Sequence, residues 1–311
     1  MQSLQQVREI YQRPLIELVA LASGIHGREF PRTRLQKASL LSIKTGGCPE
    51  NCGYCPQSAH YKTGVKRESL MSREAVVAAA GRAKEAGAER FCMGAAWREV
   101  RDGADFDRVL EMVAGVRDLG LEVCCTLGML NEDQARKLKE AGLHAYNHNI
   151  DTSRAHYEKV ISTRTYDDRL RTIANVRKAG LTVCTGGILG LGESEEDRIA
   201  FLHQLQSFEP VPESVTINTL VAIDGTPLEE SRAPGAFEVV RVVATARVLM
   251  PKSMIRLSAG RGGMSDEAQF LCFLAGANSV FLGEKLLTSP NPEILRDQTL
   301  FTKLGLGEAL Q

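Results

Sequence analysis

The chain has 311 residues, of which 43% are hydrophobic, and its 38 basic side chains balance its 38 acidic ones. A chain of this length can bury a large core, either as one large α/β domain or as two smaller ones. The zero net charge gives no electrostatic reason to expect nucleic acid or an anionic membrane as a partner. No apolar stretch approaches the roughly 18 residues of a membrane span, and the first residues lack the pattern of a secretory signal. We therefore expect a cytoplasmic protein that binds small molecules.

The predicted elements alternate along most of the chain. Residues 1–38 are expected to form an N-terminal helical cap, and residues 39–311 a barrel domain. The expected strands cover 39–46, 89–96, 121–128, 143–151, 181–190, 214–223, 253–260 and 278–287. The expected helices cover 71–87, 105–120, 131–142, 166–180, 194–208, 236–250, 266–276 and 291–304. Apolar residues recur in these helices at steps of three and four. The alternation predicts an α/β fold, a (β/α)8 barrel of the TIM type with an N-terminal helical extension.

Several strands carry a cysteine at nearly the same depth. Four of the preceding helices are expected to end at a glycine in the left-handed conformation, namely Gly87, Gly120, Gly142 and Gly180. Counted from three of these glycines, Cys92, Cys124 and Cys184 lie four or five residues into the next segment. Because strand side chains alternate between faces, Cys124 and Cys125 cannot both point into the barrel. The shared register favours Cys124 as the inward residue. Each cysteine alone could be an inert core residue, but three at one depth favour a common ligand.

The loop after the first strand contains three more cysteines, Cys48, Cys52 and Cys55, with the spacing C-x3-C-x2-C. In a reducing cytosol such a group is expected to bind metal rather than to form disulfides. A structural zinc site would need a fourth protein ligand, for which His60 is a candidate. The alternative is a [4Fe–4S] cluster held by three thiolates, with one iron left open for a small chelating molecule.

With Tyr54 at its aromatic position, this loop resembles the C-x3-C-x-Φ-C signature of the radical S-adenosylmethionine (SAM) enzymes. The resemblance implies that Cys48, Cys52 and Cys55 bind a [4Fe–4S] cluster and that SAM occupies the open iron. It also implies that an electron from the cluster cleaves SAM to a 5′-deoxyadenosyl radical.

Two further segments fit the same superfamily. The segment GGILGLGE lacks the G-K-[ST] ending of a phosphate-binding loop. It matches the superfamily pattern G-x-I-x-G-x-x-E, which is expected near the adenine, at Gly186, Ile188, Gly190 and Glu193. The segment MGAAW lies where the superfamily holds the methionine amino group with strand backbone, which places Ala95 at that position.

Longer matches narrow the resemblance to the biotin synthase family. They are SIKTGGCPENCGYCPQSAHYKTG at 42–64, RFCMGAAW at 90–97, YNHNIDTS at 146–153, GGILGLGE at 186–193, IRLSAGR at 255–261 and TSPNPE at 288–293. The family closes dethiobiotin to biotin by inserting sulfur. It implies a second cluster, a [2Fe–2S] cluster, inside the barrel. Its implied ligands are Cys92, Cys124, Cys184 and Arg256.

The resemblance also implies ligand contacts. Asn149 and Asp151 are expected at the SAM ribose, and Arg169 at the methionine carboxylate. The expected dethiobiotin contacts are Asn147, Asn149 and Asn218 at the ring and Thr288 and Ser289 at the tail carboxylate. Amide side chains suit a ureido ring because they both donate and accept hydrogen bonds. At Thr288 and Ser289 the chain departs from the family, which often has two threonines there.

The partners implied by the family are dethiobiotin, a flavodoxin- or ferredoxin-like electron donor, iron–sulfur assembly machinery and a second copy in a homodimer. Cys125 and Cys272 match no ligand position and are expected to be structural. Two alternatives remain at this point. The chain could be another radical SAM enzyme with a similar barrel, of the hydrogenase-maturation or methylornithine-forming type, or a non-catalytic iron–sulfur carrier or sensor.

Overall fold

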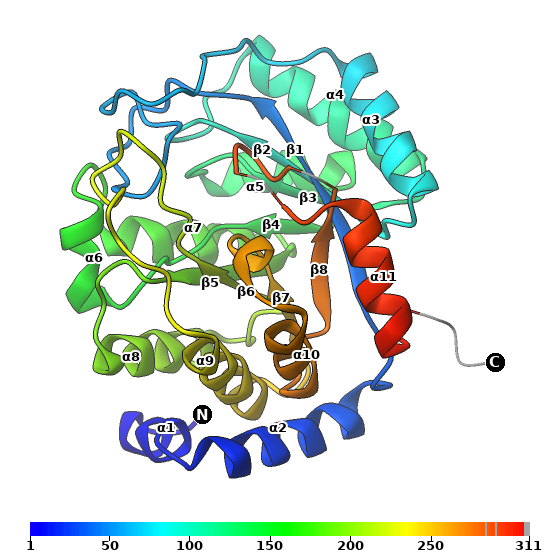
Figure 1. The fold of residues 1–311 in the computed structure, drawn as a ribbon. Helices are drawn as coiled ribbons and strands as arrows, with labels where there is room; N and C mark the ends of the chain where they lie inside the picture. Colours follow the sequence, from blue (N-terminus) through cyan, green and yellow to red (C-terminus); the bar gives the residue numbers. More distant parts are fainter. Residues whose placement is uncertain (284, 290, 308–311) are drawn as a thin grey trace.

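The computed structural model describes residues 1–283, 285–289 and 291–307. Its centre is a closed barrel of parallel strands, each paired with the next along the chain and the last with the first (Figure 1). The strands are β1 (Gln36–Lys44), β2 (Arg90–Ala95), β3 (Glu122–Thr126), β4 (Ala145–Asn147), β5 (Thr182–Leu189), β6 (Ser214–Thr219), β7 (Met254–Leu257) and β8 (Ser279–Leu282). The (β/α)8 prediction is therefore confirmed for the described residues. Glu284, in the last expected strand, and Pro290, in the TSPNPE segment, lie outside them.

Helices surround the barrel between successive strands (Figure 1). They are α3 (Arg73–Glu85), α4 (Ala104–Asp118), α5 (Glu132–Ala141), α6 (Arg154–Val160), α7 (Tyr166–Lys178), α8 (Glu195–Gln206), α9 (Ala236–Leu249), the 3-10 turn η1 (Arg261–Gly263), α10 (Asp266–Leu274) and α11 (Ile294–Leu304). The sequence did not predict α6, a single short helix capped by the Ser153 hydroxyl. The four helix-stop glycines all have positive φ, between 72° and 102°, as expected for left-handed helix ends.

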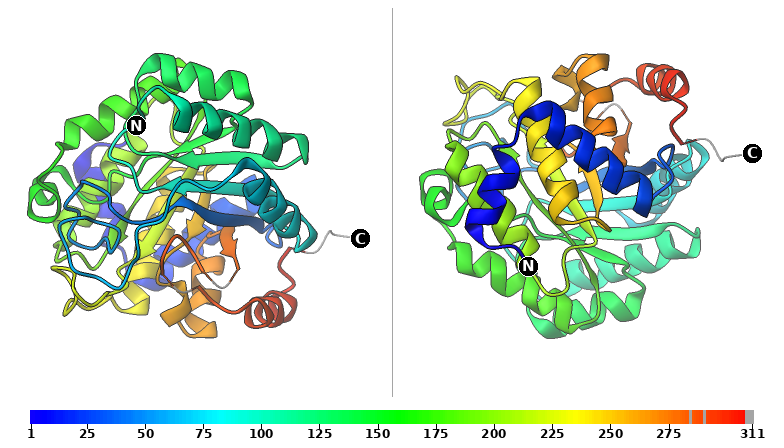
Figure 2. Two further views of the ribbon diagram at one scale, coloured as in Figure 1. Left: turned by 90° about the horizontal axis from the view of Figure 1, so that it is seen from above. Right: turned by 90° about the horizontal axis from the view of Figure 1, so that it is seen from below.

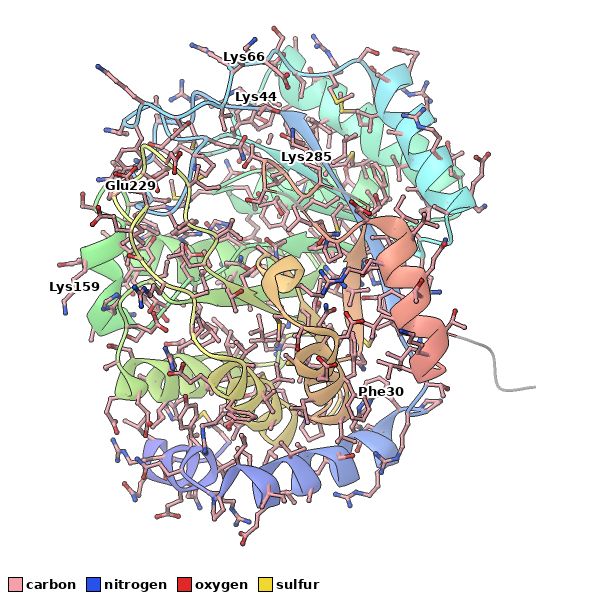
Figure 3. All side chains as sticks on the ribbon, in the orientation of Figure 1. Phe30, Lys44, Lys66, Lys159, Glu229 and Lys285 are labelled. Carbon is pink, nitrogen blue, oxygen red and sulfur yellow. The ribbon has the colours of Figure 1, made fainter. Side chains whose placement is uncertain are left out.

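Two further helices, α1 (Leu4–Tyr11) and α2 (Leu15–Glu29), cross one end of the barrel (Figure 2, right). They pack against α8 and α9, with Val7, Leu18 and Ala22 fully buried. This helical extension agrees with the expected cap, although β1 already begins at Gln36. Phe30, at the end of α2, and Lys44, at the end of β1, lie toward opposite ends of the molecule (Figure 3). The cap thus covers the amino-terminal ends of the strands and leaves their carboxyl ends free.

Strand alternation divides the buried residues into two layers. Phe91, Val123 and Cys125 belong to the large core that includes the surrounding helices. Cys92, which follows Phe91, and Cys124, which lies between Val123 and Cys125, belong to a smaller cluster. Cys124 lines the interior cavity described below and Cys125 does not, which confirms Cys124 as the inward residue. Among the described helices, none is long and apolar enough to cross a membrane.

Candidate active site

The barrel contains a cavity of ≈ 300 Å³ near the carboxyl ends of the strands, the end seen from above in Figure 2 (left). Active sites of TIM-type barrels are built at this end. The cavity is lined by cysteines of both groups, namely Cys48, Cys52, Cys55, Cys92 and Cys124. Predicted residues of other kinds also line it, namely Tyr54, Ala95, Asn147, Asn149, Asp151, Arg169, Ile188, Asn218, Arg256, Thr288 and Ser289. The fold therefore brings most of the predicted site together.

The cysteine loop is folded back on itself by backbone hydrogen bonds. The Cys48 amide donates to the Gln57 carbonyl at 2.9 Å, and the Cys55 amide donates to the Cys52 carbonyl at 2.9 Å. Burial raises the pKa of all three thiols, and that of Cys55 to about 12. Such thiols stay neutral at pH 7 unless a metal supplies positive charge, because metal ligands must be deprotonated. Three free thiols beside one cavity therefore suit a metal cluster that offsets their burial.

His60 does not join these thiols. Its ring Nε2 lies 3.0 Å from the Pro49 carbonyl, and the residue is exposed and does not line the cavity. The zinc interpretation thus loses the fourth ligand that it required. Within the part of the chain that the structure describes, no three His, Cys, Asp or Glu side chains are placed to hold a single metal ion. A [4Fe–4S] cluster has a different requirement, because its thiolates bind separate irons.

A buried ion pair lies beside the cysteine loop. The Arg169 guanidinium pairs with the Asp151 carboxylate and also donates to the Tyr157 hydroxyl and the Asn149 carbonyl, both at 2.9 Å. The Tyr54 hydroxyl donates to the same Asp151 carboxylate at 2.9 Å. Asp151 adopts a φ of 66°, a conformation rare outside glycine that aspartate tolerates better than most residues. The residues predicted for SAM at this point therefore form one connected network before any ligand binds.

The predicted adenine motif is only partly at the cavity. Ile188 lines the cavity, but Gly186, Gly190 and Glu193 do not. A Cβ on Gly186 would lie 1.9 Å from the Thr216 carbonyl oxygen, so this glycine permits close approach of β5 and β6. The Glu193 carboxylate accepts from the Gly190 amide at 3.0 Å and pairs with Arg198 at 2.8 Å. Gly186 thus lies within β5, and Gly190 and Glu193 shape the turn after it. A contact of these three residues with adenine stays a prediction.

The inner cysteines lie deeper in the barrel. Cys92 and Cys124 are register partners on β2 and β3. A hydrogen bond from Cys124, together with the positive charges of Arg256 and Arg90, lowers the pKa of Cys92 to about 7. Cys184 is fully buried without lining the cavity, and its sulfur accepts from the Asn147 amide at 3.3 Å. Cys92 is therefore the inner thiol whose surroundings favour a thiolate, because the same hydrogen bond, together with burial, raises the pKa of Cys124.

Arg256 is a buried cation with neutral partners. Its Nε donates to the Ser279 hydroxyl at 2.8 Å, its Nη2 donates to the Gln36 side chain at 3.0 Å, and the guanidinium lies over the Phe281 ring. Within the described residues no carboxylate forms an ion pair with it, so the salt-bridge interpretation of such an arginine does not apply. A buried charge without a counter-ion is costly. An anionic thiolate-bound cluster would supply the missing negative charge.

Sequence reasoning missed some charged residues at the site. Arg90 lies two residues before Cys92, so the two side chains share a face of β2. Its guanidinium pairs with Glu122 at 2.9 Å, and its Nη1 is buried without a partner. Burial lowers the pKa of Arg90, but the charges of Cys124, Cys92 and Cys184 outweigh this effect and raise it. Glu50 and Arg164 also line the cavity, beside the cysteine loop. In the sequence, only the two-residue period of a strand could have indicated that Arg90 faces the same side of β2 as Cys92.

The asparagines predicted to contact the substrate ring are held in fixed orientations. The Asn149 side-chain oxygen accepts from the Thr216 hydroxyl at 3.0 Å and the Asn147 amide at 3.3 Å. The Asn218 amide donates to the Gly187 carbonyl at 2.9 Å and its oxygen accepts from the Ala259 backbone at 3.1 Å. Polar groups held in this way lose little freedom when a ligand binds.

Comparison with known proteins identifies the family. The model of the radical SAM superfamily matches residues 42–205, and that of the biotin and thiamin synthesis associated domain matches residues 216–307. A biotin synthase of Myxococcus xanthus is 60% identical over 304 residues, covering 98% of this chain and 88% of the relative. A biotin synthase of Legionella pneumophila is 58% identical over 306 residues, covering 98% and 97%.

Solved structures of low identity share the fold. A methylornithine synthase superposes with a TM-score of 0.82 at 20% identity, covering 99% of this chain and 94% of its own. A maturase of the [FeFe]-hydrogenase superposes with a TM-score of 0.76 at 18% identity, covering 90% and 64%. The similarity to these two solved structures establishes only the barrel fold. The 58–60% identity to biotin synthases over nearly the whole chain establishes the family. The chain belongs to the biotin synthase family of the radical SAM superfamily.

Proposed function

We propose that the chain converts dethiobiotin to biotin, using SAM, a [4Fe–4S] cluster and a [2Fe–2S] cluster. The observation that carries this proposal is that one cavity is lined by the three cysteines of the loop and by Cys92 and Cys124 of the strands. A carrier or sensor would have no need of a cavity shared by its two cysteine groups. The similarity to biotin synthases over 98% of the chain supports the choice among radical SAM reactions.

In this proposal Cys48, Cys52 and Cys55 hold the [4Fe–4S] cluster and leave one iron for the amino and carboxylate groups of SAM. When bound, the cluster and SAM together supply the 5′-deoxyadenosyl radical that removes hydrogen from dethiobiotin. The proposed SAM contacts are Tyr54, Ala95, Asn149, Asp151, Arg169, Gly186, Ile188, Gly190 and Glu193. The network of Arg169 and Asp151 would orient the ligand, since its members are already fixed by hydrogen bonds.

The proposed [2Fe–2S] ligands are Cys92, Cys124, Cys184 and Arg256, and this cluster would supply the inserted sulfur. Arg256 suits the role because it is 1% exposed and has only neutral partners among the described residues. Asn147, Asn149 and Asn218 would orient the ureido ring. Thr288 and Ser289, on the segment after β8, would bind the tail carboxylate. The surrounding barrel would exclude water and competing groups from a reactive radical.

The family also suggests a setting for the enzyme. We propose a cytoplasmic homodimer with a helical cap and a barrel domain. An electron donor of the flavodoxin or ferredoxin type would reduce the outer cluster. Iron–sulfur assembly machinery would build both clusters.

Anaerobic reconstitution tests the proposal. The loaded protein should convert dethiobiotin to biotin with SAM and a strong reductant, and should contain the iron of both clusters, about six per chain. Cys52→Ala should abolish SAM cleavage. Cys184→Ala should impair the inner cluster and biotin formation while some cleavage persists. Formation of 5′-deoxyadenosine without biotin would favour another radical SAM reaction, and no SAM cleavage would favour a carrier.

A further inference from the structure

Arg164 is a buried arginine that the proposed chemistry does not use. It lies between α6 and α7, its side chain is 8% exposed, and it lines the cavity. Its Nη2 lies 3.9 Å from the Cys52 sulfur, within hydrogen-bond range for a sulfur acceptor. Its Nε is buried without a hydrogen-bond partner. The Arg164 guanidinium therefore directs N–H donors at the cysteine loop, and the residues around it provide too few acceptors for all of its N–H groups.

Glu50 is the counter-charge of Arg164. This carboxylate is 2% exposed, lies within the cysteine loop, and has an oxygen 4.0 Å from the Arg164 Nε. Arg98 approaches the other oxygen at 3.3 Å, and the Thr163 hydroxyl donates to the carboxylate. The attraction of the Glu50 carboxylate therefore holds the Arg164 guanidinium on the side of the cysteine loop where Glu50 lies.

The backbone holds the two segments together. The Asn51 amide donates to the Thr163 hydroxyl at 3.1 Å, and the Asn51 side-chain oxygen accepts from the backbone amides of Ser162 and Thr163 at 3.0 and 3.1 Å. The Gly53 amide donates to the Val160 carbonyl at 2.9 Å. Segments separated by about 110 residues in the chain are thus joined on both sides of Cys52, and the backbone that leads to Arg164 cannot move away from it without breaking these bonds.

We propose that Arg164 is a positioning residue of the [4Fe–4S] site, which donates a hydrogen bond to the Cys52 thiolate and raises the reduction potential of the cluster, with Glu50 as the opposing charge. This inference rests on the proposed assignment of that cluster to Cys48, Cys52 and Cys55. Hydrogen bonds to cluster sulfurs and nearby charges set the potentials of iron–sulfur clusters. Reduction adds one negative charge, so a nearby cation favours it and a nearby anion opposes it.

The test is the midpoint potential of the reconstituted [4Fe–4S] cluster, measured by redox titration with electron paramagnetic resonance and without dethiobiotin. Arg164→Met should shift the potential to more negative values, and Arg164→Lys should shift it less because the charge is kept. Glu50→Gln should shift it to more positive values. Arg154→Met is the matched control, since this neighbouring arginine is exposed and pairs with Asp167 instead of the loop. It should leave the potential unchanged.

If the midpoint potential shifts in opposite directions in Arg164→Met and Glu50→Gln, the cause is the charge of the two side chains. Simple loosening of the loop would shift the potential of both variants in the same direction. Shifts in the same direction, or none beyond that of Arg154→Met, would overturn the inference. If Arg164→Met assembles too little cluster for titration, Glu50→Gln decides, and the absence of a positive shift overturns it. The potential is independent of the product, so a wild type that makes no biotin would refute the proposed function and leave this test intact.

Discussion

Cys92 and Cys124 face each other across the β2–β3 ladder as register partners, and both side chains line the barrel interior. The next residue along β3, Cys125, packs on the opposite face in the core shared with the helices. Two adjacent cysteines of equal burial thus have different surroundings. The hydrogen bond to Cys92 and burial raise the pKa of Cys124, against the nearby charge of Arg90, whereas burial and the charge of Cys92 raise the pKa of Cys125.

This pair gives a direct test of the inner cluster. Cys124→Ala should remove the iron of the inner cluster, leaving about four irons per chain from the outer one. Cys125→Ala should keep both clusters and lose only about 1 kcal/mol of unfolding free energy, as for deletion of one buried methyl-sized group. Iron and sulfide analysis with Mössbauer spectroscopy distinguishes the two variants. Equal iron contents in both would contradict the assignment of Cys124.

The sequence predicted the barrel because each of its units carries a strong periodic signal. The strands hold short apolar runs and the helices end at glycines, and these patterns are local. The start of β1 was misplaced because Gln36 and Lys37 are polar, yet both pair with β8. The helix α6 was missed because its seven residues, RAHYEKV, are too few for a clear amphipathic period.

The site was predictable where chemistry demands a rare pattern, as in the spacing of Cys48, Cys52 and Cys55. It was not predictable for Glu50 and Arg164. In sequence these are two charged loop residues, and such residues usually face water. Their burial beside Cys52 depends on contacts between segments about 110 residues apart, which no local pattern records.

Gly186 provides a test of whether the glycine motif acts through packing. Gly186→Ala would place a Cβ against the Thr216 carbonyl, so we expect the protein without cofactors to lose about 3 kcal/mol or more of unfolding free energy. The control is Gly81→Ala in α3, where a Cβ meets nothing within 4 Å. That change should stabilise by about 0.5–1 kcal/mol. Urea unfolding measures both. A neutral Gly186→Ala that only weakens SAM binding would favour a purely ligand-contacting role.

A buried ion pair fastens α11 to the barrel. The Arg261 guanidinium binds the Asp297 carboxylate with both of its terminal nitrogens, at 2.6 and 2.7 Å, and both side chains are almost fully buried. Asp297→Ala should cost about 3–5 kcal/mol because it leaves a buried charge unpaired. Replacing both partners, with Arg261→Met and Asp297→Leu, should recover much of that loss. Glu140→Ala in the exposed pair Arg136–Glu140 should cost at most about 0.5 kcal/mol. A double variant as unstable as Asp297→Ala would contradict this account.

His26 couples the helical cap to pH. It lies on α2, is 3% exposed, and its Nε2 has no hydrogen-bond partner. Burial, with the charges of Arg247 and Arg32, lowers its pKa from 6.5 to about 4. Because the folded state disfavours the proton, the lowered pKa of His26 costs almost no stability above pH 6.5, where the residue is neutral in both states. As the pH falls from 6.5 to 4 the unfolded chain binds the proton first, and stability declines by up to about 3 kcal/mol before levelling off.

The comparison of wild type with His26→Leu isolates this effect, since every other titrating group is common to both proteins. Urea unfolding at pH 7 and pH 4.5 should show a larger acid loss in the wild type, by about 2–3 kcal/mol. The leucine keeps an apolar side chain against Phe30, whose ring meets His26 edge-on at 5.8 Å. Equal acid losses in the two proteins would mean that His26 is protonated without cost in the folded state, and so that α2 does not bury it in solution.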